Sequence, residues 1–253
     1  MRFKGKVALV TAGSAGIGKA TAEIMFREGA SVVLVARDEQ RLCSVAASLD
    51  SSGGRAMGIA CNALDPKAVK EAVQETVARF GRIDILVNGV GGSTVVSKPL
   101  AKVEELAFEE WQKLVAFNMD ATFLFCHEAV PHMKRQGGGK IVNISSIAWR
   151  GLAPSSVAYA AAKGGIVAFT KKLSFEVAEF GINVNTVAPS FTATERMQES
   201  WNSRGEEGRK AVVSAIPLGR IATPEDQARV ICFLASSDSD FITGTTLDVT
   251  GGL

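Results

Sequence analysis

The sequence has little of what membrane insertion, disulfide bonding or metal binding requires. No stretch of 18 apolar residues occurs, and the apolar run near the N-terminus is too short for a signal sequence. The four cysteines, Cys43, Cys61, Cys126 and Cys232, form no C-x-x-C pair, and the two histidines have no acidic or hydroxyl partner by motif. We therefore expect reduced thiols, no zinc site, no membrane span and a cytoplasmic location.

The chain also lacks an excess of charge of either sign. Its 28 Lys and Arg residues nearly balance 26 Asp and Glu residues, for a formal charge of +2, and 21% of the residues are charged. This composition lacks the excess of positive charge that is typical of proteins that bind nucleic acid or an anionic membrane. Small neutral or mildly anionic ligands fit it better.

Short β-branched runs alternate with longer helical patterns along the chain. This rhythm is typical of βαβ units around a parallel sheet. With 253 residues and no linker or repeat, we expect one α/β domain spanning residues 1–253. We predict seven strands, including the runs at residues 7–10, 32–35, 85–87, 140–144, 182–187 and 246–249.

One segment interrupts this rhythm, from about residue 191 to residue 216. It carries several threonines and arginines together with Trp201, and it precedes Pro217. Long connections at the carboxyl ends of strands are where α/β folds bind ligands. We therefore predict that this segment is a substrate lid.

A glycine-rich string, Thr11-Ala12-Gly13-Ser14-Ala15-Gly16-Ile17-Gly18, follows the first predicted strand and leads into a helical pattern. Glycines let the backbone approach a pyrophosphate, and a helix N-terminus offers unpaired N–H groups with a favourable dipole. The alternative is an ordinary tight turn. The position between strand and helix favours a nucleotide-binding loop.

The second strand ends at Ala36-Arg37-Asp38, where nucleotide folds select between two cofactors. An acidic residue there binds the ribose hydroxyls of NAD(H), whereas an arginine pairs with the 2′-phosphate of NADP(H). Arg37 favours NADP(H). Asp38 leaves NAD(H) open, since it could turn toward the ribose or pair with Arg37, and Ala15 adds no second positive charge.

Tyr159 and Lys163 are four residues apart, which places both side chains on one face of a helix, with Cβ atoms roughly 5–6 Å apart. A free tyrosine has a pKa of about 10 and transfers protons poorly near neutral pH unless a nearby positive charge favours the phenolate. Lys163 could supply that charge. The alternative is an ordinary helix with a half-buried tyrosine and a solvated lysine.

Taken with the glycine-rich loop, this pair resembles the short-chain dehydrogenase/reductase family, in particular its 3-oxoacyl-reductase-like branch. The resemblance extends over nearly the whole chain and implies a Rossmann fold, a doubly wound parallel sheet with helices on both faces. Further matching segments lie at residues 84–88, 117–119, 143–146, 187–189, 241–244 and 251–252.

The resemblance implies four catalytic residues. Tyr159 would be the general acid or base at the substrate oxygen, and Lys163 would lower its pKa and bind the nicotinamide ribose. Ser146, 13 residues before Tyr159, would hold the substrate oxygen, with Ser145 as its structural neighbour. Asn118 would anchor a water that links Lys163 to solvent.

The resemblance also implies a set of cofactor-binding residues along the sheet edge. Asn62 would contact adenine, Asn88 and Gly89 the inner ribose, and Thr192 the nicotinamide amide. The chain departs from the family pattern where Ala12 replaces the first loop glycine, and we expect this replacement to shift the turn slightly. The full set is Ala12, Gly13, Ser14, Gly16, Ile17, Gly18, Arg37, Asn62, Ala63, Asn88, Gly89, Tyr159, Lys163, Pro189 and Thr192.

The implied activity is NAD(P)(H)-dependent hydride transfer between nicotinamide and a small ketone or secondary alcohol. Gly137 and Phe180 stand where acyl-carrier reductases commonly carry arginines, which argues against an acidic carrier protein as partner. A 3-oxoacyl-[acyl-carrier-protein] or acyl-CoA reductase remains the alternative within this class. A nucleotide-binding sensor or scaffold, and a sugar-nucleotide epimerase or dehydratase, are the alternatives outside it.

Two further features bear on substrate and assembly. Trp149 and Trp201 either line an apolar substrate pocket or lie in an interface between subunits. Gly164 and Gly165 each cost about 1 kcal/mol in a helix relative to alanine, which close packing would explain. Because this helix usually lies in a subunit interface of the family, we expect a homo-oligomer, a homotetramer by family pattern.

Overall fold

The computed structural model describes all residues from 1 to 253, and its centre is a seven-stranded sheet in which every strand is parallel. The order β3-β2-β1-β4-β5-β6-β7 confirms the predicted doubly wound sheet. None of the runs named from the sequence corresponds to β3, because its alanines and glycine are only weakly typical of a strand. The strands are β1 Val7–Thr11, β2 Ser31–Ala36, β3 Ala56–Ala60, β4 Ile85–Asn88, β5 Gly139–Ile144, β6 Ile182–Pro189 and β7 Thr246–Val249.

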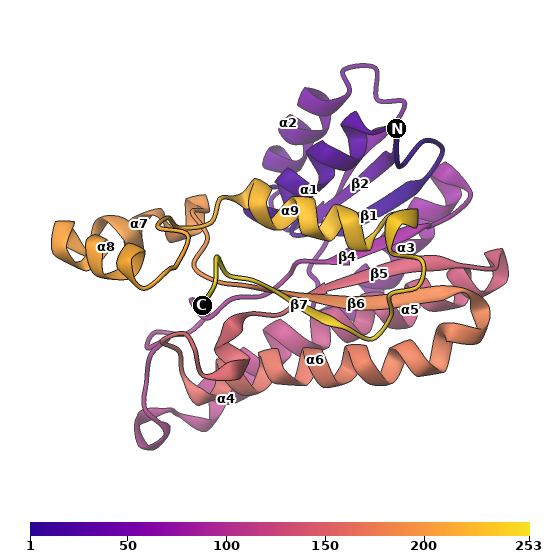
Figure 1. Cartoon of the computed structure of the whole chain (residues 1–253). Helices are drawn as coiled ribbons and strands as arrows, with labels where there is room; N and C mark the ends of the chain where they lie inside the picture. The colour runs from indigo at the N-terminus through magenta and orange to yellow at the C-terminus, as the bar shows by residue number, and fades with distance from the viewer.

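Helices cover both faces of the sheet, as predicted (Figure 1). The strands β1 and β2 are apolar except for Thr11 and Ser31 at their ends, because both of their faces are buried. One core lies under α1 Gly16–Arg27, α2 Glu39–Leu49 and α9 Pro224–Leu234. The other lies under α3 Pro66–Phe80, α5 Ala121–Gln136 and α6 Val157–Val177, with α4 Phe108–Val115 beside α6.

A buried polar network fixes α6 to the sheet. Asn143 on β5 donates from Nδ2 to Thr170 Oγ1 on α6 at 2.8 Å, and Thr186 Oγ1 on β6 lies 2.8 Å from the same oxygen. On the other side, Asn88 Nδ2 on β4 donates to Asn143 Oδ1 at 2.8 Å. Buried polar groups are costly unless paired, so this network specifies how α6 sits on the strands.

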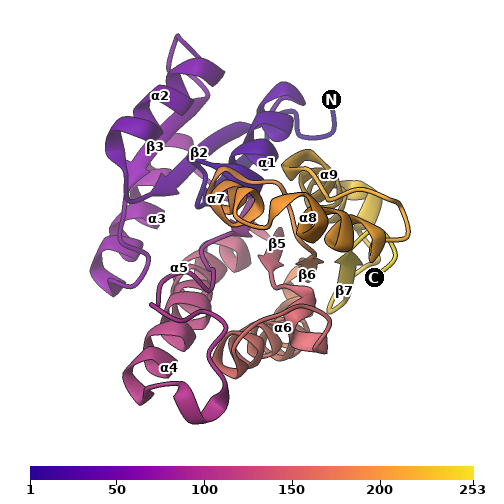
Figure 2. The same ribbon diagram turned by 90° about the vertical axis from the view of Figure 1, so that its left-hand side faces the viewer.

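The carboxyl ends of all strands meet at one edge of the sheet, and the strand order reverses between β1 and β4. Ligands bind at such a switch point in open α/β sheets. The segment after β6 forms α7 Gln198–Asn202 and α8 Gly205–Ser214, which lie across this edge in front of β5, β6 and β7 (Figure 2). The fold therefore brings this segment to the place where a ligand would bind.

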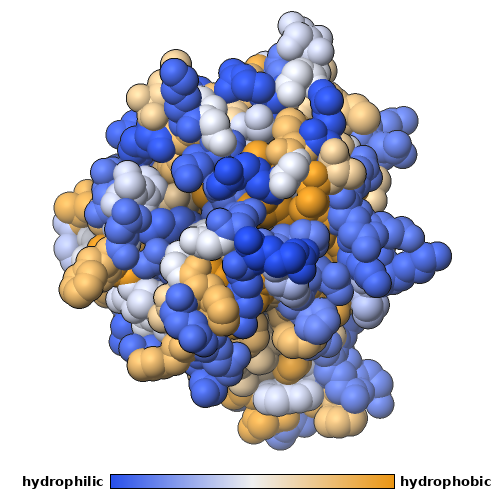
Figure 3. All heavy atoms as spheres, turned by 90° about the vertical axis from the view of Figure 1, so that its right-hand side faces the viewer, coloured by the Kyte–Doolittle hydropathy of each residue, from blue (hydrophilic) through white to orange (hydrophobic).

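Hydrophilic side chains cover most of the face at the opposite end of the strands (Figure 3). No helix in the protein has the length and apolar character that crossing a bilayer would require.

Candidate functional site

The glycine-rich loop joins β1 to α1, and Ala12 near its start adopts a backbone conformation that is typical of glycine. Ala12 is the one residue other than glycine with a positive φ, at 52°. That conformation costs an L-residue roughly 1–2 kcal/mol. Ala12 thus adopts a conformation that glycine would take without this cost. Gly13 follows with its N–H bonded to Val35 O at 3.2 Å.

The loop leaves no room for side chains at its other glycines. A Cβ on Gly18 would collide with the Ala12 carbonyl oxygen, and one on Gly13 would lie 2.8 Å from Val10 O. Beside them, the N–H of Gly16 at the start of α1 donates to the carboxylate Oε2 of Glu195 at 3.3 Å. An anionic oxygen thus already bonds this helix N-terminus, so the loop fits the phosphate groups of a dinucleotide.

Two arginines and a carboxylate follow the end of β2, near the same loop. Arg37 is exposed and forms no ion pair, while Asp38 caps α2 by accepting from Arg41 N at 3.0 Å. Asp38 therefore forms no ion pair with Arg37, and its Oδ1 is bonded to the N-terminus of α2. Arg41, which the sequence analysis overlooked, donates from Nε to Ser14 O at 3.0 Å and adds a second positive charge.

The end of β4 is tied to the end of β1. Thr11 Oγ1 accepts from Gly89 N at 2.8 Å and from Val90 N at 3.3 Å. A Cβ on Gly89 would lie 2.7 Å from Thr11 O, so the backbone approaches closely here. The side chain of Asn88 is buried and bonds Asn143, so it faces the next strand, and Gly89 is the residue placed at the open edge.

The remaining predicted cofactor residues lie along the same edge. Asn62 is exposed just after β3, where its Oδ1 accepts from Leu64 N at 3.2 Å, and Ala63 beside it is buried. Pro189 ends β6. Thr192 is buried with its hydroxyl donating to Ser190 O at 3.0 Å, which anchors the start of the predicted lid.

Helix α6 and the loop after β5 bring the predicted catalytic side chains together. Ser156 caps α6 by accepting from Tyr159 N at 3.4 Å, and Lys163 extends one turn further to donate from Nζ to Ile144 O at 2.9 Å. Ser145 donates to the Lys163 carbonyl at 2.7 Å, which gives it the expected structural place. Ser146 Oγ, which accepts from Ala148 N at 3.2 Å, lies near the Tyr159 phenol.

The pKa shifts at this site differ from the expectation that Lys163 lowers the pKa of Tyr159. Burial raises the pKa of Tyr159, and the nearby Ser146 hydroxyl and the Arg196 charge oppose that rise. Burial lowers the pKa of Lys163 to about 7, and Arg196 lowers it further. The lysine Nζ lies 5.8 Å from the centre of the tyrosine ring. Lys163 is thus the group whose pKa lies near neutral pH.

Asn118 lies in a single π-helical stretch, Ala116–Asp120, between α4 and α5. Such stretches are rare and frequently occur at functional sites. Its side chain accepts from Gly92 N at 2.9 Å and donates to Gly92 O at 3.1 Å and Leu114 O at 2.8 Å. A Cβ on Gly91 would lie 2.6 Å from Asn118 Oδ1 and 2.8 Å from Lys163 Nζ, so these two groups flank Gly91.

Two residues of the segment 191–216 connect it to this site through contacts that the sequence did not indicate. Glu195 bonds Gly16, and its Oε1 lies 3.2 Å from Arg41 Nη2. Arg196 donates from Nη1 to Gly91 O at 2.7 Å. Their partners are 179 and 105 residues away in the sequence, so no local spacing pattern predicts these contacts.

The two tryptophans considered for a substrate pocket are placed differently. Trp201 packs in the lid against Phe191, with ring centres 5.5 Å apart. Trp149 stacks under Arg150, whose Cζ lies 4.2 Å from the ring centre, and its indole N–H is buried without an acceptor. Trp201 therefore packs within the segment 191–216.

The glycines after Lys163 are also distinguished by the structure. A Cβ on Gly165 would lie 2.5 Å from Met119 Sδ, whereas one on Gly164 would meet nothing nearer than Trp149 Cβ at 3.8 Å. Close packing within the chain thus explains Gly165 and leaves Gly164 unexplained.

Comparison with known proteins places this arrangement in a family. Residues 11–253 match the family model described as enoyl-(acyl carrier protein) reductase. The chain is 36% identical over 253 residues to the 3-oxoacyl-[acyl-carrier-protein] reductase FabG of Thermotoga maritima, covering 100% of this chain and 99% of the relative. It is 38% identical over 252 residues to the D-threitol dehydrogenase of Mycolicibacterium smegmatis, covering 99% and 94%.

A solved structure of a short-chain type dehydrogenase/reductase from Mycobacterium ulcerans has the same fold. It matches with a TM-score of 0.92 at 27% identity, over 100% of this chain and 90% of that one. The matches extend along the whole chain and include the sheet edge just described. The protein is therefore a member of the short-chain dehydrogenase/reductase family, oxidoreductases that act on CH–OH and C=O groups with nicotinamide cofactors.

Proposed function

We propose that this protein is an NADP(H)-dependent carbonyl reductase or secondary-alcohol dehydrogenase of the cytoplasm. The observation that supports this most is the convergence of Ser146, Tyr159 and Lys163 beside a phosphate-binding loop, at the switch point of the sheet. A non-catalytic nucleotide sensor would not need these side chains together. An epimerase would cause no net oxidation of the nicotinamide cofactor, so the assay below distinguishes it from a reductase.

Each catalytic side chain has a role that follows from its chemistry. The bound nicotinamide supplies or accepts the hydride. Ser146 donates a hydrogen bond to the substrate oxygen, where negative charge develops during reduction, and Tyr159 donates the proton to that oxygen. Lys163, when charged, favours negative charge on the phenol and binds the nicotinamide ribose. Asn118 holds Gly92 and anchors the water that leads to solvent.

Two positive charges support NADP(H) over NAD(H). Arg37 is exposed and unpaired at the end of β2, and Arg41 lies against the glycine-rich loop one turn later. Guanidinium groups bind phosphate with paired hydrogen bonds, so the two together suit a 2′-phosphate. Asp38, the residue that would favour NAD(H), is occupied in capping α2.

An absorbance assay at the reduced-nicotinamide band tests this function. We expect a panel of small ketones to oxidise NADPH, and the matching secondary alcohols to reduce NADP⁺, with kcat/KM for the phosphorylated cofactor higher by about tenfold or more. A higher kcat/KM with NADH would contradict the cofactor preference. Binding of cofactor without net redox turnover on any member of the panel would favour a sensor or an epimerase.

The segment 191–216 is proposed as a lid that closes over the cofactor. Glu195 and Arg196 bridge it to the glycine-rich loop and to Gly91. The Glu195 carboxylate lies where cofactor phosphate would approach Gly16, so like charges would repel. We infer that the Glu195 side chain turns away from Gly16 when the cofactor binds.

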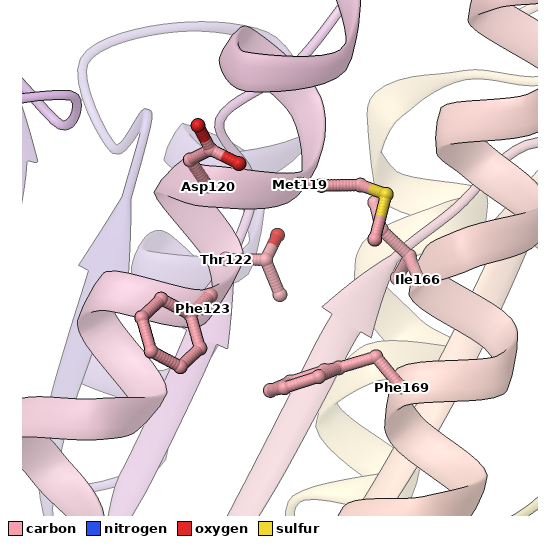
Figure 4. Close-up of a pocket in the computed structure, with 6 residues that line it drawn as sticks. All are labelled: Met119, Asp120, Thr122, Phe123, Ile166 and Phe169. Carbon is pink, nitrogen blue, oxygen red and sulfur yellow. The ribbon is translucent and has the colours of Figure 1, made fainter.

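We also propose a homotetramer formed in part through α5 and α6. Between these helices lies a surface hollow of about 230 Å³, lined mainly by apolar side chains (Figure 4). Phe123 in this hollow is 50% exposed, so its ring is available to pack against another subunit. Light scattering at micromolar concentration is expected to give four times the 26.6 kDa chain mass. A monomer mass would contradict the proposal.

Reduction of a 3-oxoacyl thioester is the second candidate. Lys134 Nζ lies 4.1 Å from the centre of the Phe180 ring, so this corner keeps a positive charge although Gly137 and Phe180 replace arginines. If the carrier-bound thioester were reduced with a higher kcat/KM than its free thioester analogue, this candidate would replace the first.

A further inference from the structure

Arg196 places a guanidinium group beside the catalytic pair. Its Nη1 donates to the carbonyl oxygen of Gly91 at 2.7 Å. A Cβ on the same Gly91 would touch Lys163 Nζ at 2.8 Å, and a Cβ on Gly92 would lie 2.5 Å from Arg196 Nη1. Arg196 and Lys163 thus both lie against the backbone of Gly91 and Gly92.

This guanidinium has unused hydrogen-bonding capacity. A guanidinium offers five N–H donors, and Arg196 makes a single hydrogen bond, to a neutral carbonyl. It forms no ion pair. The neighbouring carboxylate, Glu195, is directed to Arg41 and to the N–H of Gly16. Another acid of the sheet edge, Asp248, pairs with Arg150 at 2.7 Å.

The region around the reacting groups is therefore positive and lacks a balancing carboxylate. The Arg196 charge lowers the pKa of both Tyr159 and Lys163. An anion bound to Arg196 would offset that effect on Lys163, because an opposite charge favours the protonated amine. Binding of an anionic substrate would then restore the lysine charge when it is needed for proton transfer.

We propose that Arg196 binds the carboxylate of the substrate, so that the protein acts on small oxo acids and the corresponding hydroxy acids. This inference rests on the proposed function and names its substrate class. A planar guanidinium can bind both oxygens of a carboxylate, which fixes the substrate's orientation as well as its position. The carbonyl oxygen of the same substrate would then meet Ser146 and Tyr159, since the Arg196 charge acts on the Tyr159 phenol.

Paired substrates test the proposal. We would measure kcat/KM with NADPH for 2-oxobutanoate, for 3-oxobutanoate and for the methyl ester of each. The wild type is expected to prefer at least one free acid over its ester by about 10-fold to 100-fold, as a charge-assisted hydrogen bond would give. Arg196→Met is expected to lower this acid-over-ester ratio at least tenfold, and Arg196→Lys to retain part of it.

Arg209→Met is the matched control. Arg209 is a lid arginine that likewise donates to a backbone carbonyl, Gly205 O at 3.0 Å, but on α8. The acid-over-ester ratio should not change in this variant. Equal losses on acid and ester in Arg196→Met, carried by the KM of the cofactor, would assign Arg196 to the cofactor phosphates and overturn the proposal.

The outcomes also separate this inference from the function on which it rests. Turnover of the esters with no preference for either acid would overturn the inference alone. Absence of turnover on acids and esters, together with the neutral ketones of the panel, would overturn both.

Discussion

Replacing Tyr159 with phenylalanine is expected to lower kcat by about a thousandfold or more, because it removes the O–H group that delivers the proton to the substrate oxygen. Cofactor affinity should change little, since Lys163 keeps its bond to Ile144 and the glycine-rich loop is untouched. Fluorescence titration with NADPH would report affinity, and stopped-flow absorbance would report turnover. Turnover within a few-fold of the wild type would contradict the assigned role.

Tyr159 also predicts how the two directions depend on pH. Burial raises the phenol pKa, so the phenol stays protonated at neutral pH. Ketone reduction, which needs the proton, should therefore slow as the pH rises through the phenol pKa, and alcohol oxidation should speed up. Tyr159 is the sole tyrosine of the chain, so the difference in ultraviolet absorbance between wild type and Tyr159→Phe would report its titration directly.

Gly91→Ala is expected to reduce kcat/KM by about a hundredfold or more. The added Cβ would lie 2.6 Å from Asn118 Oδ1 and 2.8 Å from Lys163 Nζ, so one or both groups must move. Misplacement of catalytic groups by even an ångström can cost that much. The backbone at Gly91 also has φ near +155°, which an alanine adopts at a cost of about 1–3 kcal/mol in folding free energy.

Gly138→Ala separates these two effects. Gly138 has the same φ of +155°, and a Cβ there would meet only Gly181 O at 3.2 Å, away from the site. Thermal unfolding should show comparable destabilisation in both variants, whereas kcat/KM per folded molecule should fall in Gly91→Ala alone. Equal activity of the two variants would show that Gly91 does not hold the catalytic groups in place.

The sequence predicted the features that depend on local pattern. Buried parallel strands are mostly apolar, and a strand, a glycine-rich string and a helix in succession place a phosphate loop at the sheet edge. β3 went unmarked because its sequence, AMGIA, has few β-branched residues. The sequence left the role of Asp38 open, although its place just before α2 is the usual position of a capping carboxylate.

Features that depend on distant contacts could not be predicted in this way. Glu195 and Arg196 meet residues more than a hundred positions away, and nothing in the sequence around them indicates those partners. The expectation that Lys163 lowers the pKa of Tyr159 considered one pair of residues alone. Burial is a property of the whole fold, and here it is the largest cause of the pKa shift of both Tyr159 and Lys163.

The most direct test of the account follows the hydride itself. A ketone that the enzyme reduces would be converted with NADPH carrying deuterium at both C4 positions of the nicotinamide, and the alcohol would be analysed by mass spectrometry and NMR. The account predicts one deuterium per product molecule, bound to the former carbonyl carbon. An alcohol without deuterium at that carbon would contradict direct hydride transfer at this site.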